Sequence, residues 1–256
     1  MSQYKIEAGS GQHIGDRPEQ QDRVALMAAP NASGFMLAVL ADGMGGSSGG
    51  AIAAEQVIRT ARELFDKFSP VSGDIEVMLR NLVREAHTII QLSGLSTEKE
   101  PHSTMVALIL TPTGTAHWAH VGDSRLYRFR GPALAERTRD HSLIERMVAQ
   151  GRLDAGHAIN HRLAHVLVNV LGSPSAQPFV TLGRFDGLSA GDAFLLCSDG
   201  LWHYFSDQEL AEAVALAGSG PRQIAELLIN TARARAVGSR GDNCTLALVK
   251  LVTPAG

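Results

Sequence analysis

Four aspartates lie next to a glycine at the ends of apolar runs that have the composition of strands. They occur in the pairs Asp42-Gly43, Gly122-Asp123, Asp199-Gly200 and Gly241-Asp242. Asp and Gly are common in tight turns, so a single pair of this kind carries little information. Four such pairs place four carboxylates at strand ends, and neighbouring strands would bring them to one end of a sandwich.

Carboxylates held together without a counter-charge would destabilise the fold, and a bound cation removes this conflict. The candidate ligands are hard oxygens with no His or Cys at zinc-like spacing beside them, which favours octahedral Mn²⁺ or Mg²⁺ over Zn²⁺. The glycine after Asp42 also lets a backbone carbonyl approach an ion. Two ions roughly 3.5–4 Å apart suit hydrolysis of a phosphate ester, because they acidify a shared water and neutralise phosphoryl charge.

Seven short motifs occur in an order that resembles the metal-dependent serine/threonine phosphatases of the protein phosphatase 2C type, in their compact bacterial form. The resemblance covers nearly the whole chain, and the order of the motifs makes it specific. The motifs are Gly15-Asp16-Arg17-Pro18-Glu19-Gln20-Gln21-Asp22, Ala41-Asp42-Gly43-Met44-Gly45-Gly46, Ser103-Thr104, His120-Val121-Gly122-Asp123-Ser124-Arg125, Asp140-His141-Ser142, Leu195-Leu196-Cys197-Ser198-Asp199-Gly200-Leu201 and Gly241-Asp242-Asn243-Cys244-Thr245.

The resemblance implies a metal site built from the four aspartates. Asp42 would bridge two ions, the Gly43 carbonyl would bind one of them, and Asp199 and Asp242 would bind the other. Asp123 resembles the position that holds a third, weaker ion, shared with Asp199. Mn²⁺ or Mg²⁺ is therefore the expected cofactor.

The same resemblance implies roles for two residues near the N-terminus and a reaction. Arg17 would clamp the substrate phosphate with its planar fork of donors, and Asp22 would order metal-bound waters. The expected substrates are phosphoserine and phosphothreonine on proteins, produced by a cognate serine/threonine kinase, and the activated water would attack their phosphate directly. Gln21 departs from the family pattern, which usually has an acidic residue there. Met44 replaces a histidine that many eukaryotic members carry, so the general acid is unassigned.

The elements that must position these residues are predicted from hydrophobic periodicity. Period-two or continuous apolar runs predict strands over 23–28, 35–41, 104–111, 115–121, 126–130, 179–185, 193–198 and 244–252. Three- and four-residue spacing predicts helices over 51–68, 74–92, 142–150, 207–217 and 221–236. Consecutive strands broken by two blocks of helices favour an antiparallel α+β fold over a parallel sheet.

The family resemblance sharpens this to a four-layer α-β-β-α sandwich, in which helices flank two packed antiparallel sheets. No long linker or repeat interrupts the chain, so we expect one phosphatase domain over residues 1–256. The segment at about 141–171 resembles the family's flap beside the cleft.

Composition excludes several other classes. With a net charge of −3, the chain has no excess of basic residues of the kind that bind nucleic acid or an anionic membrane. No apolar run approaches the ~18 residues of a membrane span, and the first 23 residues are polar, so we expect a cytoplasmic protein, without nucleic acid or membrane partners, as a monomer. Cys197 and Cys244 lie within apolar runs and are expected to be buried, reduced thiols.

Other functional interpretations fit less well. The glycine-rich segment after Asp42 lacks the Gly-Lys-Ser/Thr of a nucleotide-binding loop. A cysteine phosphatase needs Arg six residues after its thiolate, and Cys197 is followed there by His203. His157, His161 and His165 could imitate a metal site on a helix, but a packing or solvated face is the better interpretation.

Two alternatives stay open. One is a binding module of the same fold that recognises phosphoproteins without efficient turnover, for which Gln21 is the main argument. The other is a hydrolase of small phosphoesters, which only substrate profiling separates from a protein phosphatase.

Overall fold

The computed structural model describes residues 4–46, 48–71, 73–95, 100–154, 163, 166–238 and 241–254. Within these residues the chain forms two antiparallel sheets. The first has the strand order β1-β11-β10-β7-β8, in which β1 is Lys5–His13, β11 Cys244–Val252, β10 Asp192–Cys197, β7 Arg125–Arg130 and β8 Ala133–Arg137. The second has the order β2-β3-β5-β6-β9, in which β2 is Asp22–Ala28, β3 Met36–Met44, β5 Met105–Leu110, β6 Ala116–Val121 and β9 Thr181–Phe185. The short strand β4, His102–Ser103, pairs with the end of β3.

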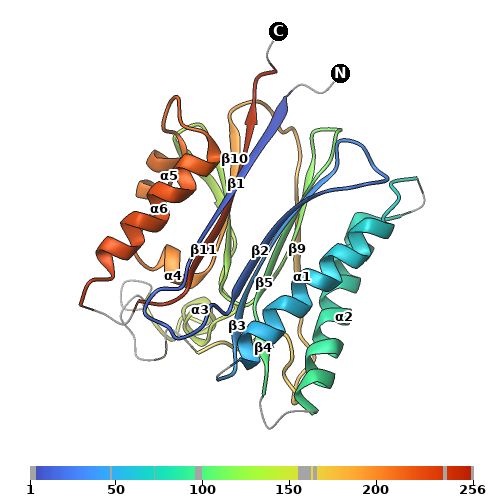
Figure 1. Cartoon of the computed structure of the whole chain (residues 1–256), viewed down its shortest axis with the longest axis vertical. Coiled ribbons are helices and arrows are strands. Elements are labelled where there is room, and N and C mark those ends of the chain that lie inside the picture. The colour runs from blue at the N-terminus through green and yellow to red at the C-terminus, as the bar shows by residue number, and fades with distance from the viewer. Residues whose placement is uncertain are drawn as a thin grey trace.

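Helices cover the outer face of each sheet (Figure 1). Helices α1 (Gly49–Lys67) and α2 (Ile75–Leu95) lie on the second sheet, and α5 (Asp207–Val214) and α6 (Pro221–Arg235) lie on the first. The shorter helices are α3 (Leu143–Ala149) and α4 (Asp199–Trp202). The expected α-β-β-α sandwich is therefore confirmed.

Among the described residues, three apolar cores hold the four layers together, and the side chains of β3 contribute to two of them. Leu37 and Val39 contribute to the core under α1 and α2, whereas Ala38 and Leu40 contribute to the core between the sheets. Successive side chains of a strand point to opposite faces, so a strand buried on both faces must be apolar at every position. This explains why β3, β5 and β10 appear in the sequence as continuous apolar runs.

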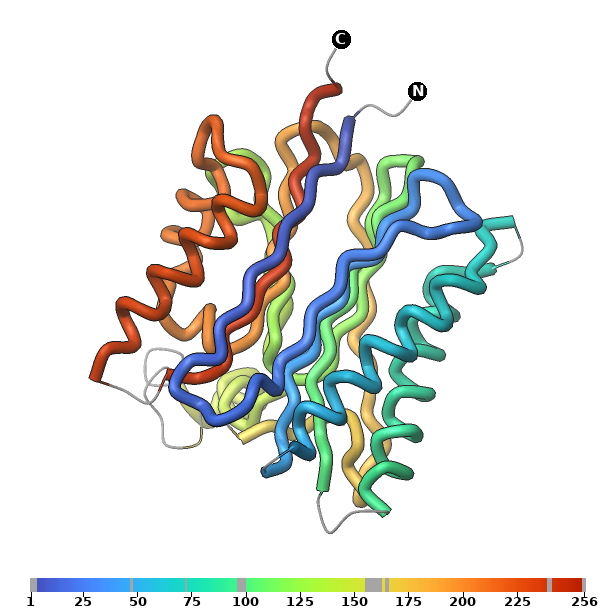
Figure 2. The backbone as a smooth tube through the Cα atoms, in the orientation of Figure 1, coloured from blue at the N-terminus to red at the C-terminus, as the bar shows by residue number. Residues whose placement is uncertain are grey.

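The predicted helices and strands are all present, with ends shifted by a few residues. Four elements of the described structure were not predicted: β1, the two-residue strand β4, β8 and the single-turn α4. Strands β1 and β8 are the two edges of the first sheet and are buried at few positions, so their sequences lack a regular apolar pattern. Figure 2 shows the first strand running beside the last, and this pairing extends from Lys5 opposite Val252 to His13 opposite Cys244.

Both cysteines are buried free thiols, as expected. In the described part of the chain, no helix combines the length and the apolar character needed to cross a bilayer. Part of the segment expected to resemble a flap, including His157, His161 and His165, lies outside the described residues.

Candidate metal and phosphate site

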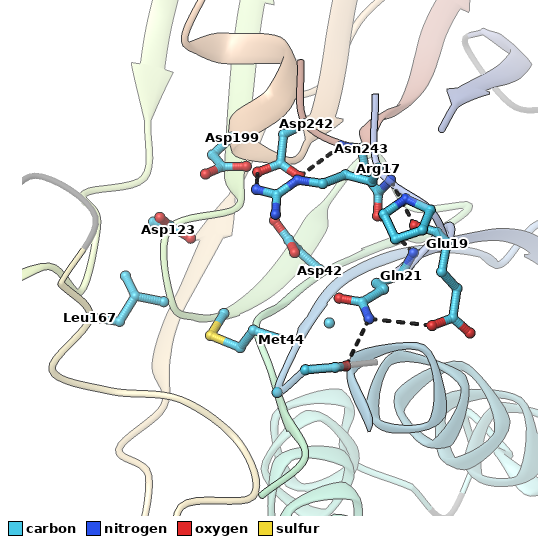
Figure 3. A pocket seen from close by; sticks show the side chains of 14 residues that line it. Arg17, Glu19, Gln21, Asp42, Met44, Asp123, Leu167, Asp199, Asp242 and Asn243 are labelled. Atoms are coloured by element: carbon cyan, nitrogen blue, oxygen red, sulfur yellow. Dashed lines mark hydrogen bonds and ion pairs between the residues drawn. The ribbon is translucent and has the colours of Figure 1, made fainter. Parts of the chain in front are cut away.

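A cavity of about 520 Å³ opens where β3, β6 and β10 end and β11 begins. Figure 3 shows the carboxylates of four separate segments around this space, with the Arg17 side chain beside Asp242. Of the predicted site residues, the cavity is lined by Arg17, Asp42, Gly43, Asp123, Asp199 and Asp242. Residues far apart in the sequence are thus brought together at one end of the sandwich.

The backbone of Asp42 is held on both sides by the Ser103-Thr104 pair. The Asp42 amide donates to Thr104 Oγ1 at 3.0 Å, and its carbonyl accepts from the Thr104 amide at 2.9 Å and from Ser103 Oγ at 3.1 Å. Thr104 Oγ1 also bonds to Ser124 Oγ at 2.7 Å, next to Asp123. The short motif Ser103-Thr104 therefore anchors the strand end that carries the central aspartate.

Gly43 must be glycine because the chain crowds it. A Cβ at this position would lie 2.0 Å from the carbonyl oxygen of Gly50 and 2.8 Å from that of Gln21. The same reason applies to Gly200, where a Cβ would lie 2.0 Å from the carbonyl oxygen of Asn243. The glycines next to the aspartates thus allow backbone segments to meet at the cavity.

Asp199 and Asp242 are brought together by the pairing of the segments before and after them. The Ser198 amide donates to the Thr245 carbonyl at 3.0 Å, and the Thr245 amide donates to Ser198 Oγ at 3.1 Å. Asp199 follows as the first residue of α4, and Asp242 precedes β11. The exchange of hydrogen bonds between the two segments places both carboxylates on the same wall.

Asp123 is fixed through the backbone of its turn. Trp202 Nε1 donates to the Asp123 carbonyl at 3.0 Å. His141 Nδ1 accepts from the Gly122 amide at 3.2 Å, and the His141 amide donates to the Gly122 carbonyl at 2.7 Å. The Asp140-His141-Ser142 motif therefore supports the turn that carries Asp123, although it does not line the cavity.

The electrostatics of the carboxylates indicate a site with more negative charge than Arg17 alone can balance. Burial raises the pKa of Asp42 well above its ordinary value, and the charges of Asp22 and Asp199 raise it further. Burial likewise raises the pKa of Asp123 well above its ordinary value, with a further contribution from Asp199. Both shifts mean that ionised carboxylates are unfavourable here unless a cation accompanies them.

Asp22 does not line the cavity but lies behind it. It is opposite Asp42 in the β2–β3 register and is only 1% exposed. Its Oδ2 accepts from Ser198 Oγ at 2.8 Å, whereas its Oδ1 is buried without a hydrogen-bond partner. Burial raises the pKa of Asp22 to about 7.

Arg17 pairs with one of the predicted ligands. Its Nη2 lies 2.6 Å from Asp242 Oδ2, and both side chains are partly exposed. This hydrogen bond raises the pKa of Arg17. Within the described residues, no three His, Cys, Asp or Glu side chains are grouped closely enough to enclose an ion as they stand. Arg17 occupies Asp242 Oδ2, so an ion bound at this oxygen would compete with that contact.

The donor set fits a hard divalent cation. The described lining residues include no His or Cys, and the carboxylates are mutually repulsive and partly desolvated. Oxygen donors of this kind match Mn²⁺ or Mg²⁺.

Sequence reasoning assigned no role to several residues that shape the cavity. Asn243 lines it and bonds to the Arg17 loop, and Gln21 Nε2 donates to the Gly46 carbonyl at 3.1 Å. Glu19 Oε2 accepts from the Ser48 amide at 2.7 Å, and Leu167 lines the cavity from the far side. Asn243 belongs to the motif Gly241-Asp242-Asn243-Cys244-Thr245, and this membership was the only signal in the sequence that indicated it.

Comparisons with known proteins agree with this geometry. The family model for protein phosphatase 2C matches residues 11–219. Serine/threonine protein phosphatase PstP of Mycobacterium tuberculosis (strain H37Rv) is 30% identical over 224 residues, which are 86% of this chain and 41% of that protein. The chain thus spans about two fifths of the length of this relative.

Two further relatives match over most of their length. Serine/threonine phosphatase stp of Listeria monocytogenes (strain EGD-e) is 28% identical over 228 residues, with 84% of each chain covered. A crystal structure of the catalytic domain of serine/threonine protein phosphatase PstP in complex with two manganese ions superposes with a TM-score of 0.79, at 27% identity, covering 96% of this chain and 98% of that chain.

Proposed function

Because the chain belongs to the protein phosphatase 2C family, we propose that it removes phosphate from phosphoserine and phosphothreonine on proteins. The observation that supports this proposal most is the convergence of Asp42, Asp123, Asp199 and Asp242 with Arg17 on one cavity. Carboxylates and a single guanidinium are the groups that a metal-dependent phosphatase needs, the former for the ions and the latter for the phosphate.

In this proposal Asp42 and the Gly43 carbonyl, with Asp199 and Asp242, hold two Mn²⁺ or Mg²⁺ ions, and Asp123 contributes to a third. When bound, the ions lower the pKa of a water and neutralise charge on the phosphoryl oxygens. The crystal structure of PstP with two manganese ions supports the expected number for the main site.

The protein's own groups then bind and orient the substrate. Arg17 is at the mouth of the cavity, with a side chain 53% exposed, and its guanidinium would leave Asp242 to bind two phosphate oxygens. Asp22, behind Asp42, would order water at the rear of the cavity. Met44 lines the cavity and has no proton to give, so we assign protonation of the leaving alkoxide to water.

We also propose that residues 1–256 act as one phosphatase domain whose segment 141–171 borders the substrate entrance. The described ends of that segment support this, because the Leu143 amide donates to the Val166 carbonyl at 2.7 Å and Leu167 lines the cavity. The substrates would be phosphoproteins produced by a serine/threonine kinase.

The test is release of phosphate from a phosphothreonine peptide. We expect release to require Mn²⁺ or Mg²⁺, to stop with chelator, and to fall by roughly 100-fold or more in Asp42→Asn, since the ions contribute several kcal/mol to transition-state stabilisation. Asp186→Asn is the matched control, because Asp186 is exposed and pairs only locally with Arg184 at 2.7 Å.

Either of two outcomes would contradict this proposal. Turnover in a fully metal-free preparation would eliminate the metal-dependent reaction. Tight binding of the phosphopeptide without Mn²⁺-dependent release would favour the phosphoprotein-binding module instead. Parallel assays on small phosphoesters separate a protein phosphatase from a general phosphoesterase.

A further inference from the structure

The Asn243 side chain connects the segment that carries Asp242 to the loop that carries Arg17. It is buried, and its Nδ2 donates to the Ile14 carbonyl at 2.7 Å and to the Glu19 carbonyl at 3.1 Å. Its Oδ1 accepts from the Gln21 amide at 2.7 Å. The three backbone groups lie on both sides of Arg17 in the sequence, so the whole loop is wrapped around one carboxamide.

These hydrogen bonds require a carboxamide at this position. The loop presents two carbonyl oxygens and one amide to the side chain, and only a group with two N–H donors and one oxygen acceptor satisfies all three. An aspartate of the same shape would accept from Gln21 but would face two carbonyl oxygens without a donor. Buried polar groups left unpaired in this way are unfavourable, so the loop would move.

A second contact holds the same loop on its outer side. Asp16 Oδ2 accepts from the Gly241 amide at 2.8 Å, its Oδ1 accepts from Arg233 Nη2 at 3.1 Å, and the Asp16 amide donates to the Gly241 carbonyl at 2.8 Å. None of these bonds involves the Asn243 side chain, so they would remain when its bonds are lost. A change at Asn243 is therefore expected to shift the loop around Arg17 without detaching it.

We propose that Asn243 is a positioning residue for phosphate recognition, which holds the loop 14–21 so that Arg17 reaches the space between Asp42 and Asp199. This inference rests on the proposed phosphatase function. Asn243 lines the cavity at its Arg17 side, and the charges of Asp199 and Asp42 both act on Arg17. A small displacement of a substrate-binding cation weakens its contact with phosphate, because such contacts depend on geometry.

The experiment compares Asn243→Asp, Asn243→Ala, Arg17→Ala and the double variant Arg17→Ala/Asn243→Ala. For each, we would measure KM and kcat on a phosphothreonine peptide and the inhibition constant of inorganic phosphate. Asn31→Asp is the control, since Asn31 also donates to a backbone carbonyl, that of Asp66, but is exposed and does not line the cavity.

We expect both Asn243 variants to raise KM and the phosphate inhibition constant roughly tenfold, with a smaller change in kcat, because a charge-assisted hydrogen bond to phosphate is weakened. In the Arg17→Ala background, the Asn243 change should add less than about twofold, since it acts through Arg17. Asn31→Asp should match the unsubstituted protein.

Two results would overturn the inference. One is an Asn243 variant that folds and lowers kcat while KM and phosphate inhibition stay unchanged; another is a double variant whose two effects on KM multiply. If Asn243→Asp does not fold, Asn243→Ser, which keeps one donor and one acceptor, is measured in its place. Failure of the proposed function looks different, because the unsubstituted protein itself would then show no Mn²⁺-dependent release.

Discussion

Replacing Asp22 by Asn should stabilise the metal-free protein at pH 8. Asp22 is 1% exposed, its Oδ1 has no hydrogen-bond partner, and burial raises its pKa to about 7 from an ordinary value of 3.8. Without metal, its negative charge is a cost to the folded state that an isosteric, neutral amide does not carry. In the proposed function, the Asp22 carboxylate is needed when ions are bound, because it orders water at the rear of the cavity.

The sign and size follow from proton linkage. Because the folded pKa lies above the unfolded one, the folded protein binds more protons between pH 4 and 7, and the free energy of unfolding falls as pH rises through that window. A shift of about 3 pKa units corresponds to about 4 kcal/mol at pH 8, as an order of magnitude. Asn weakens the hydrogen bond from Ser198 Oγ by about 1 kcal/mol and places its amide group where Oδ1 has no partner, which costs about 1 kcal/mol more. A net gain of about 2 kcal/mol remains.

Thermal melts in chelator test this. At about 2–4 °C per kcal/mol for a chain of this size, Asp22→Asn should melt roughly 4–8 °C higher than the unsubstituted protein at pH 8, and the difference should fall by more than half at pH 5. Adding Mn²⁺ should raise the melting temperature of the unsubstituted protein more than that of the variant, since the ion offsets the charge that the variant lacks.

Asp192→Asn is the matched control. Asp192 is also a fully buried carboxylate, but Arg128 and Arg130 lie 3.3 Å and 3.1 Å away. Neutralising it leaves buried Arg128 without its partner, so this variant should be destabilised by about 3–5 kcal/mol. The reasoning about Asp22 is refuted if both variants melt below the unsubstituted protein at pH 8 in chelator.

Two further predictions concern Arg17 and the buried histidines. Arg17→Ala should raise KM for the substrate yet tighten Mn²⁺ binding, because Asp242 Oδ2 loses the guanidinium that competes with the ion. The Arg17–Asp242 pair is partly exposed to solvent and contributes about 0.2–1 kcal/mol, so calorimetry should show a Kd for Mn²⁺ that is lower by at most about fivefold. A higher Kd for Mn²⁺ would contradict this competition. Burial lowers the pKa of His87, of His120 to about 3 and of His141 to about 4, so the free energy of unfolding should fall as pH drops below about 6.5, by up to about 1.4 kcal/mol per pH unit for each histidine. Urea denaturation should be measured in a variant with Asp22, Asp42 and Asp123 all replaced by Asn, because the raised pKa values of these three carboxylates give the opposite trend. A free energy of unfolding that does not change between pH 6.5 and 4.5 in that variant would disprove the prediction.

Much of the fold could be predicted from local sequence. Helix α2 repeats apolar residues at three- and four-residue steps, and β3 is apolar over most of its length. Each element places its apolar side chains on the faces that become buried, so the pattern can be read within the element itself. The aspartates beside glycines at the ends of β3 and β10 are equally local features. Such patterns predict the type of element and the presence of a carboxylate at its end.

Strands β1 and β8 could not be predicted in this way. At the two edges of the first sheet they are only partly buried, so they are held mainly by backbone hydrogen bonds to β11 and β7. Few of their apolar side chains, such as Ile6 and Leu134, pack against a core. Hydrogen bonds between backbones are available to almost any sequence and leave no pattern in it.

The arrangement of the cavity was decided only by the tertiary structure. Asp22 and Asp42 are both aspartates near strand ends, yet the β2–β3 register buries one behind the other, and only the second lines the cavity. The contact of Arg17 with Asp242 and the bonds of Asn243 to the Arg17 loop join residues more than 200 positions apart. Residue type and spacing therefore indicate which side chains are available to bind metal and phosphate. Burial, strand register and long-range contacts determine which of these side chains come together, because they depend on how the sheets pack and not on neighbours along the chain.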